Sequence, residues 1–445
     1  MKKVAITTLG CKVNQFESAS FASSFAQAGC ELVPFAGKAD VYVINTCAVT
    51  GRAAQQSRQL IRRALKANPA ARLVVTGCFA QMAPSEIVDL ADSPLCIVGN
   101  GNKHLVVEAA LTERTCDLSV LMGNIRLKRE ITPLPVRRFS GRTRAFLRIQ
   151  DGCDNFCSYC IVPYTRGRSR SLPMEQVLEQ TAVFAGEGYR EIVITGINVG
   201  KYGLDLVGGI SLTTLIARLC RDFPTMRFRL SSVELTEVDD RLLALMNNEP
   251  NFMPHLHIPL QSGDNDILAR MNRRYTAEEF SRTVTRIAGA VPPAAIGCDI
   301  LCGFPGESEA AHDNTFRLLA DLPVTYLHVF PYSRRPGTLA ASMNRQLPKK
   351  IKDQRVRRLR ELDRTLRSRF HELHFGTVRQ VLVERVHRTS GLLQGFSDNY
   401  IPVRFEGDSR LKGTIVPVRL DRFLADGGIF GTAVQTQLEI ISRNR

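Results

Sequence analysis

The sequence of 445 residues has no hydrophobic run long enough to cross a membrane, which would need about 20 consecutive apolar residues. It also has no disulfide framework, because its 12 cysteines stand at irregular spacings in a long chain. The first residues, Met1 to Cys11, imitate a lipoprotein signal, but their short apolar stretch contains Thr7 and Thr8 and is followed directly by Lys12. We therefore expect a cytoplasmic protein in a reducing compartment, with no membrane partner.

Acidic residues are too few to balance the basic ones: 43 Asp and Glu stand against 59 Lys and Arg, and the net charge is +16. Such an excess favours a polyanionic partner, and nucleic acid is the obvious candidate. Much of it lies between Lys349 and Arg369, where apolar residues recur at helical spacing (Ile351, Val356, Leu359, Leu362 and Leu366). This predicts an amphipathic helix with one basic face, which could equally be an ordinary solvated face.

Three cysteines, Cys153, Cys157 and Cys160, stand within eight residues, directly after a strand-like run over 145–150. Three thiolates so close together can hold three irons of a cubane cluster and leave the fourth iron without a protein ligand. A structural zinc site would need a fourth Cys or His at comparable spacing, and the nearest downstream histidine is His255. The spacing therefore favours an iron-sulfur cluster with one open iron.

Three further cysteines, Cys11, Cys47 and Cys78, each follow a probable strand, at 4–8, 41–45 and 72–76. The alternation of such runs with amphipathic stretches predicts an open α/β domain with a mainly parallel sheet, whose strand ends meet at one edge. Each thiol alone would be a buried small residue. Their shared placement, with Gly or Thr just before each thiol to let a cofactor approach, predicts a second three-cysteine cluster site.

Four parts are expected along the α/β chain. Residues 1–115 form the amino-terminal domain, 116–138 a linker, 139–371 a barrel-like parallel sheet of six strand and helix units, and 372–442 a small antiparallel β-barrel. The expected strands of the central part are 145–149, 191–195, 227–231, 255–260, 296–301 and 326–330, and those of the tail are 378–384, 400–405, 413–420 and 435–440. The small barrel would bind RNA or serve as a structural cap.

Together these motifs resemble the radical S-adenosylmethionine (radical SAM) methylthiotransferases over nearly the full chain. The resemblance is carried by Thr8 to Asn14, by the Cys-x3-Cys-x2-Cys motif with Tyr159 before its last cysteine, by Ile161 to Gly167, and by a tail similar to the TRAM RNA-binding barrel. The central part would then be a partial (β/α)6 radical SAM barrel, and residues 1–115 the domain that carries an auxiliary cluster.

The resemblance implies two [4Fe-4S] clusters and S-adenosylmethionine as cofactors. The catalytic cluster on Cys153, Cys157 and Cys160 would generate a 5′-deoxyadenosyl radical, and the cluster on Cys11, Cys47 and Cys78 would supply sulfur. A second S-adenosylmethionine would supply the methyl group. The implied partners are the anticodon stem-loop of tRNA and an electron donor such as flavodoxin or ferredoxin.

Other segments match the cofactor-binding places of the family. The implied contacts are Tyr159, Thr195, Gly196, Asn198, Ser232, Glu234, Gly303, Gly306 and Glu307, although turns use glycine and serine freely. We interpret the remaining cysteines as packing residues: Cys30, Cys96, Cys116, Cys220, Cys298 and Cys302. His255 and His257 share one strand face and are expected to make barrel-lining hydrogen bonds rather than bind a metal, because no acidic residue or further histidine lies nearby in the sequence.

The substrate implied by the resemblance is a tRNA adenosine beside the anticodon. Gln261 to Gly263 and Tyr332 to Thr338 differ from the branch that modifies an aspartate of a ribosomal protein. Leu9 to Asn14 and Val329 to Gly337 look more like the branch that methylthiolates C2 of N6-threonylcarbamoyladenosine than like the isopentenyladenosine branch. A basic pocket would suit the carboxylate-bearing arm of threonylcarbamoyladenosine. Arg334 and Arg335 are candidates for this pocket, but the sequence does not place them. A non-catalytic iron-sulfur RNA-binding module is the alternative of another class.

Overall fold

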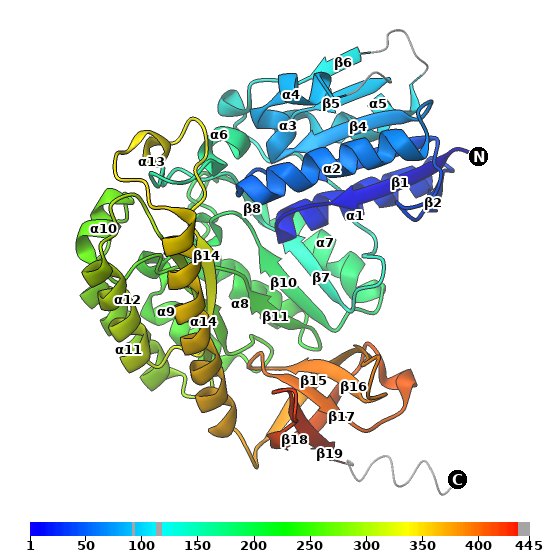
Figure 1. Ribbon diagram of the computed structural model, residues 1–445. Helices are drawn as coiled ribbons and strands as arrows, with labels where there is room; N and C mark the ends of the chain where they lie inside the picture. The colour runs from blue at the N-terminus through cyan, green and yellow to red at the C-terminus, as the bar shows by residue number, and fades with distance from the viewer. Residues whose placement is uncertain (91–93, 113–117, 435–445) are drawn as a thin grey trace, which may run out of the picture.

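The computed structural model describes residues 1–90, 94–112 and 118–434. Figure 1 shows three layers along the molecule: a parallel sheet with helices around it, a half-open barrel below it, and a small closed barrel at the carboxyl end. Cys116 and the expected strand 435–440 lie outside the described residues. Among the described helices, none is long and apolar enough to span a membrane.

The amino-terminal sheet has six parallel strands in the order β2-β1-β3-β4-β5-β6. Its strands are β1 (Lys3–Thr8), β2 (Glu31–Val33), β3 (Val41–Thr46), β4 (Arg72–Gly77), β5 (Leu95–Val98) and β6 (Leu118–Leu121). Its helices are α1 (Lys12–Gln27), α2 (Gly51–Ala67), α3 (Cys78–Met82), α4 (Pro84–Val88) and α5 (Val106–Leu111).

Both faces of this sheet are covered by helices. Val41 and Val43 of β3 pack with α1 and α5, whereas Tyr42 and Ile44 pack with α2, so alternate residues of the strand enter two separate cores. A strand buried on both faces reads as a continuous apolar run, which is why the sequence revealed it.

The region expected to be an irregular linker, 116–138, is partly regular. Leu118–Leu121 forms β6, which pairs in parallel with β5 and ends the sheet, and Ile125–Leu127 forms a short 3-10 helix. The expectation of a linker beginning at residue 116 was therefore wrong. Four half-exposed residues on one edge of a sheet carry too little periodicity to be recognised without their neighbour.

The central part has six parallel strands in two groups, β11-β10-β7 and β12-β13-β14. Isolated parallel bridges between Phe228 and Phe252 and between Ser232 and His257 connect β11 to β12. The strands are β7 (Arg144–Arg148), β10 (Glu191–Thr195), β11 (Arg227–Leu230), β12 (His255–His257), β13 (Ala295–Cys302) and β14 (Tyr326–Pro331). The partial barrel of six strand units predicted from the sequence is confirmed.

Helices α7 (Met174–Gly186), α8 (Leu212–Asp222), α9 (Asp240–Asn248), α11 (Ala277–Ala290), α12 (Glu309–Asp321) and α14 (Lys349–Glu372) cover the outside of this partial barrel. Three further helices are short, namely α6 (Val162–Arg166), α10 (Asn265–Arg270) and α13 (Leu339–Ser342), and α6 contacts α3 of the amino-terminal domain. A short antiparallel pair, β8 (Gln150–Asp151) and β9 (Arg170–Ser171), stands beside the cysteine motif.

The expected basic helix is α14. Its residues Val356, Leu359, Leu362 and Leu366 enter the central core as the spacing predicted, whereas Ile351 is 36% exposed and does not belong to that face. Arg355 is buried and pairs with Glu307, so one of the arginines is structural.

The carboxyl-terminal barrel is closed, in the order β15-β16-β17-β19-β18. Its strands are β15 (Val378–Val386), β16 (Leu393–Ser397), β17 (Pro402–Phe405), β18 (Ile415–Phe423) and β19 (Ile429–Ala433). All neighbours are antiparallel except β17 and β19, which pair in parallel. The sequence missed β16 and β19. Gly395 in β16 serves close packing, because a Cβ there would lie 2.0 Å from Leu382 O.

Arginines hold the small barrel against the central one. Arg229 donates to the carbonyl oxygens of Ser397 (3.2 Å) and Asp398 (2.9 Å), and its guanidinium lies 5.0 Å from the Tyr400 ring centroid. Glu191 lies beside Arg229 at 2.9 Å. The carboxyl-terminal barrel is thus attached to the central barrel through charged residues of β10 and β11.

Candidate functional site

The structure brings Cys153, Cys157 and Cys160 together in the loop between β8 and α6. Each of these thiols interacts electrostatically with the other two, and all three are free of disulfides. The loop follows strand β7, so the triplet lies at the carboxyl end of the barrel strands, where such barrels carry their chemistry. Arg273 donates toward Cys157 Sγ at 3.4 Å and supplies a positive charge beside the triplet.

The structure also brings Cys11, Cys47 and Cys78 together at the carboxyl ends of β1, β3 and β4. Each of the three pairs interacts electrostatically. Gly10, with φ +99°, lets the loop approach Cys47 closely, since a Cβ on Gly10 would lie 2.9 Å from Cys47 Sγ. The glycines before these cysteines were expected to admit a cofactor. They also let neighbouring strand ends approach, because a Cβ on Gly77 would lie 2.3 Å from Thr46 O, whereas the approach of a cofactor stays a prediction.

Burial acts against free thiolates at both triplets. Burial raises the pKa of Cys47 to about 12, that of Cys153 to about 11 and that of Cys160 to about 12. Burial also raises the pKa of Cys11, although Arg166 opposes this shift. A metal that coordinates the sulfur reverses this balance, because a coordinating thiol is deprotonated. Two sets of three converging thiols are a donor set that suits iron-sulfur clusters.

The two triplets lie next to each other in space. Ile161, the residue after Cys160, packs in the same hydrophobic core as Cys78 and Phe79. Asn100 Nδ2 donates to Thr165 O at 2.6 Å and approaches Cys78 Sγ at 3.9 Å. The segment that leaves the first triplet therefore packs directly against the second.

Arg166 is the centre of this contact. Its side chain is 1% exposed, and its Nη1 donates to Glu17 Oε1 at 3.1 Å and to Asp151 Oδ1 at 2.9 Å. Its Nη2 donates to Asn14 Oδ1, and Lys103 pairs with the same Glu17. This buried guanidinium thus connects α1 to the residues on both sides of the Cys153 motif, and Lys103, in the 3-10 helix before α5, joins the network through Glu17.

This buried network carries an excess of positive charge. Its members are four cations and two carboxylates, namely Arg148, Arg166, Arg170 and Lys103 with Glu17 and Asp151. Burial alone would raise the pKa of Asp151, but Arg166, Arg170 and Arg148 lower it far below the usual range. Buried excess charge is costly unless it is balanced. Cys11 and Cys78 interact electrostatically with Arg166, so thiolates at these positions would supply the missing negative charge.

A cavity of about 270 Å³ opens beside Cys157. Among the predicted cofactor contacts, Glu234 lines it, together with Asn155 and Arg273. Arg273 forms an ion pair with Glu234, and Asn155 Nδ2 lies 3.5 Å from Glu234 Oε1. Glu234, one of the implied cofactor contacts, is thus paired with an arginine. Ser232 is exposed at the end of β11, and Tyr159 packs beside Ile267 and Phe304.

Thr195, Gly196 and Asn198 lie at the end of β10, around one glutamine. Gln150 Oε1 accepts from the backbone N–H groups of Ile197 (2.9 Å) and Asn198 (2.8 Å), and a Cβ on Gly196 would lie 2.8 Å from it. The turn is therefore held against the strand that leads to the cysteine motif, which fixes its position relative to Cys153.

Gly303, Gly306 and Glu307 form a tight turn after β13. Both glycines have φ +76°, and Glu307 Oε2 accepts from the Gly303 N–H at 2.6 Å and from Arg355 Nη1 at 2.6 Å. Glu307 thus braces the turn against α14. Whether these residues contact a cofactor stays a prediction, whereas their structural role is visible.

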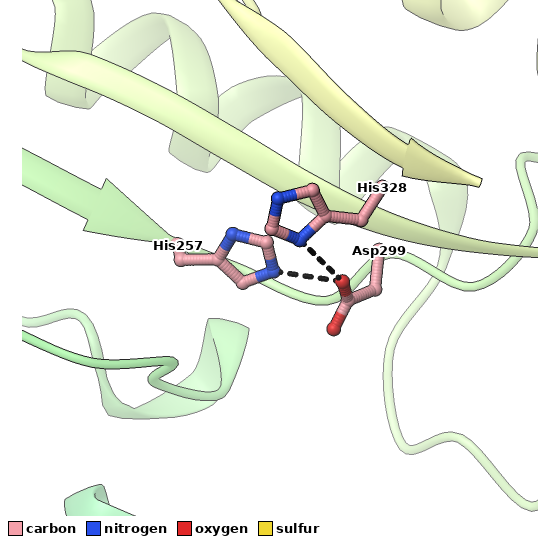
Figure 2. A group of neighbouring side chains, drawn as sticks. All are labelled: His257, Asp299 and His328. Atoms are coloured by element: carbon pink, nitrogen blue, oxygen red, sulfur yellow. Dashed lines mark ion pairs between the residues drawn. The ribbon is translucent and has the colours of Figure 1, made fainter. Parts of the chain in front are cut away.

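His255 and His257 make the expected barrel-lining hydrogen bonds. Tyr326 Oη lies 2.7 Å from His255 Nε2 and 3.2 Å from His257 Nδ1. The sequence indicated no acidic or histidine partner, but neighbouring strands supply both. Asp299 Oδ1 lies 3.0 Å from His257 Nε2 and 3.3 Å from His328 Nδ1, as Figure 2 shows.

Sequence reasoning missed Arg166, Glu17, Lys103, Arg273 and the group around Asp299. Arg166 stands inside the recognised segment Ile161 to Gly167 but had no assigned role. Arg334 and Arg335 were candidates for a basic substrate pocket. Arg335 is buried and donates to Ala48 O at 3.2 Å, which places it at the amino-terminal domain near Cys47.

A partial parallel barrel with a three-cysteine loop at its carboxyl end defines the radical SAM class of enzyme. The radical SAM superfamily profile matches residues 147–319, and uncharacterized protein family UPF0004 matches residues 3–99. The fold is similar to the radical S-adenosylmethionine methyltransferase TsrM from Kitasatospora setae, with a TM-score of 0.55 at 15% identity, covering 77% of this chain and 75% of that one.

Two curated relatives cover nearly the whole chain. A threonylcarbamoyladenosine tRNA methylthiotransferase MtaB of Aquifex aeolicus is 40% identical over 91% of this chain and 97% of its own length. The enzyme of the same name from Bacillus subtilis is 38% identical over 94% of each chain. The chain belongs to the radical SAM methylthiotransferase family, in the group of these relatives. This membership implies an enzyme that uses S-adenosylmethionine and a [4Fe-4S] cluster.

Proposed function

We propose that this protein adds a methylthio group to C2 of N6-threonylcarbamoyladenosine in tRNA, next to the anticodon. The relatives carry this activity in their names, and they match the chain almost from end to end. The observation in the structure that supports the proposal best is the placement of two cysteine triplets side by side around buried Arg166. A reaction that needs both a radical and a sulfur donor requires two such sites close together.

We assign the radical-generating [4Fe-4S] cluster to Cys153, Cys157 and Cys160, and a second [4Fe-4S] cluster to Cys11, Cys47 and Cys78. When bound, the first cluster with S-adenosylmethionine supplies the radical that removes an unactivated hydrogen, and the second supplies sulfur. The excess positive charge of the Arg166 network supports the second assignment, because it suits a group that is negative overall.

The chain's own residues hold and shield these groups. Arg273, 3.4 Å from Cys157 Sγ, places positive charge beside the first triplet and orients Glu234 at the cavity. The Gln150 contacts fix the turn at Thr195, Gly196 and Asn198 for a cofactor contact. Tyr159, Ser232, Gly303, Gly306 and Glu307 remain proposed neighbours of the cofactor. The hydrophobic core that contains both Ile161 and Cys78, together with the packing of α6 against α3, would keep water out between the triplets.

We expect substrate RNA to bind the basic surfaces of the protein. We assign residues 372–442 to a TRAM-like RNA-binding barrel, 139–371 to the radical SAM barrel, and residues up to β6 to the amino-terminal domain. The exposed arginines of α14 and the net charge of +16 suit the anticodon stem-loop. An electron donor such as flavodoxin or ferredoxin would reduce the first cluster. A tRNA substrate also suggests a cytoplasmic location.

The test uses reconstituted protein under anaerobic conditions with S-adenosylmethionine and a reductant. Anticodon stem-loops carrying either threonylcarbamoyladenosine or isopentenyladenosine at the same position are digested afterwards, and their nucleosides are measured by mass spectrometry. We expect the 2-methylthio product only from the first RNA. If only the second RNA, or a peptide with the ribosomal-protein aspartate, gave the methylthio product, that substrate would replace threonylcarbamoyladenosine in the proposal. Absence of 5′-deoxyadenosine would favour a non-catalytic RNA-binding module.

A further inference from the structure

His257, Asp299 and His328 come from the three neighbouring strands β12, β13 and β14 (Figure 2). Asp299 and His328 are direct partners in the register, and His257 is paired with Gly297, two residues before Asp299. The three side chains therefore share one face of the sheet. The opposite face of β13 carries Cys298, Ile300 and Cys302, which pack in the hydrophobic core with α12 and α14. The polar group thus faces the inside of the barrel.

Tyr326 holds the buried end of this group. Gly297 makes room for its ring, since a Cβ there would lie 2.0 Å from Tyr326 Cζ. Its Oη lies between His255 and His257, so the His257 ring is held from both sides, by Tyr326 and by Asp299. Exposure rises along the group, from 7% for the His257 side chain to 26% for Asp299 and 50% for His328. The His257 end of the group is therefore held in place, whereas the His328 end is open to a ligand.

A lysine faces the same space from the amino-terminal domain. Lys12 and Phe16 share one face of α1, four residues apart. Phe16 belongs to the central core and lies 5.3 Å from the Arg148 guanidinium of β7, so this helix face is turned toward the barrel. The side chain of Lys12 is exposed, and it directly follows Cys11.

Lys12 lies in surroundings that leave its charge unbalanced. The groups that act on it are Arg144, Asp299, Cys11 and Arg229, and no carboxylate among residues 1–90, 94–112 and 118–434 lies within ion-pair distance of its amino group. Arg144 and Arg229 are themselves paired, with Glu384 and Glu191. Lys12 is therefore the cation here that is available to an anionic ligand.

We propose that Lys12, Asp299 and His328 form the binding site for the carboxylate-bearing arm of the modified adenine. Lys12 pairs with the carboxylate, while Asp299 and His328 meet the hydroxyl and ureido N–H groups of the arm. This inference rests on the proposed function and deepens it, since it names the residues that choose between the two tRNA substrates. An apolar prenyl arm would leave Lys12 desolvated without a partner, and sites built to hydrogen-bond a substrate group reject analogues that lack it by about 10⁴-fold or more.

A divalent metal is the competing occupant, because two histidines and a carboxylate within 4.8 Å could coordinate one. The charges decide against it. Lys12 acts electrostatically on this group through Asp299, and Asp299 is the one acidic residue among the three side chains. The unpaired positive charge of Lys12 repels a divalent cation at this position and attracts a carboxylate.

The experiment measures equilibrium binding of fluorescent anticodon stem-loops to the reconstituted protein. Three RNAs carry threonylcarbamoyladenosine, its carboxamide derivative without the negative charge, or unmodified adenosine. For the wild-type protein, we expect the first RNA to bind about tenfold tighter than the carboxamide RNA, as for one charge-assisted contact, and by a larger factor than RNA with unmodified adenosine, which lacks the whole arm. Equal affinities for the first two RNAs would overturn the proposal.

Variants of Lys12 test whether this residue makes the contact with the carboxylate. Lys12→Gln is expected to weaken binding of the first RNA about tenfold and to leave the carboxamide RNA unchanged. Lys12→Arg should keep most of the preference. Lys38→Gln, a charge loss on an exposed loop of the same domain, is the matched control and should change nothing. Equal weakening of all three RNAs by Lys12→Gln would mean a phosphate contact and would overturn the proposal.

Two further measurements, of iron and of other metals, distinguish the arm site from the alternatives. Iron analysis of each variant confirms that the neighbouring cluster site on Cys11 is retained. Zinc, manganese and cobalt are measured in the wild type and in Asp299→Asn and His328→Gln, and about one equivalent that disappears in both variants would replace the arm site by a metal site. If the wild type binds the first RNA preferentially but forms no methylthio product, the proposed function fails while the arm site stands.

Discussion

Arg166 and Glu17 are 149 residues apart in the sequence, yet the guanidinium of one donates to the carboxylate of the other at 3.1 Å in a fully buried setting. Glu17 belongs to α1, which begins just after Cys11, and Arg166 ends α6, which begins just after Cys160. A single ion pair therefore fixes the position of one cysteine triplet relative to the other. Its geometry is constrained further by Asp151 and Lys103, which contact the same two side chains.

Replacing Arg166 by Gln should destabilise the protein by about 3–5 kcal/mol, because it leaves Glu17 and Asp151 buried with one partner fewer. Chemical unfolding of the cluster-free protein measures this change. Arg218→Gln is the control, since Arg218 and Asp222 form a partly exposed i,i+4 pair worth about 0.3–0.5 kcal/mol. Similar losses for both variants would show that the Arg166 network carries little of the stability.

Substitutions in the two cysteine triplets should affect different parts of the reaction. Reconstituted wild-type protein is expected to hold about eight irons, as for two cubane clusters, and Cys47→Ala and Cys153→Ala about four each. Cys153→Ala should abolish formation of 5′-deoxyadenosine. Cys47→Ala should retain it and lose the methylthio product. Iron analysis and product chromatography test this, and full methylthiolation by the Cys47 variant would refute the assigned division of labour.

Much of this arrangement could be predicted from local sequence. Strands β3, β4 and β10 are apolar runs, and the cysteines after β1, β3 and β4 converge because parallel strands share one edge. The Arg166 network could not be predicted, because a buried arginine in the sequence looks like a surface one until its partners are known. The contact of Asp299 with His328 depends on the register between two strands, which no motif encodes.

The edge strand and the closely packed glycines could not be predicted from the sequence either. β6 is a half-exposed edge strand of four residues, and the short strand β16 has a glycine at its centre, which weakens the apolar pattern. A steric role of Gly10 and Gly77 within the protein was likewise not predictable, because each makes room for the neighbouring strand end, at Cys47 and Thr46.

Acid should weaken the protein partly through Glu191. Burial alone would raise the pKa of Glu191, but Arg229 and Arg227 lower it to about 2. Because this is below the value of about 4.3 for an unfolded chain, the contribution is fully present above about pH 4.3 and is lost as the pH falls toward 2. Urea unfolding at pH 6 and pH 3.5 should show a smaller pH effect in Glu191→Gln than in the wild type.

The control for this comparison is Asp240→Asn, because Asp240 is exposed and its pair with Arg286 lies at the surface. That variant should keep the wild-type pH effect. Equal pH effects in the wild type and Glu191→Gln would mean that other carboxylates dominate acid unfolding.

Gly10 and Gly29 both have positive φ, +99° and +73°, but they differ in the space around them. A Cβ on Gly10 would lie 2.9 Å from both Cβ and Sγ of Cys47, whereas nothing lies within 4 Å of one on Gly29. Gly29→Ala should therefore cost only backbone strain, about 1 kcal/mol, and keep about eight irons. Gly10→Ala adds a steric clash that displaces Cys47, so it should retain about four irons while still forming 5′-deoxyadenosine. Iron analysis and a deoxyadenosine assay decide this, and a full iron content in Gly10→Ala would show that Cys47 does not need its observed position to hold a cluster.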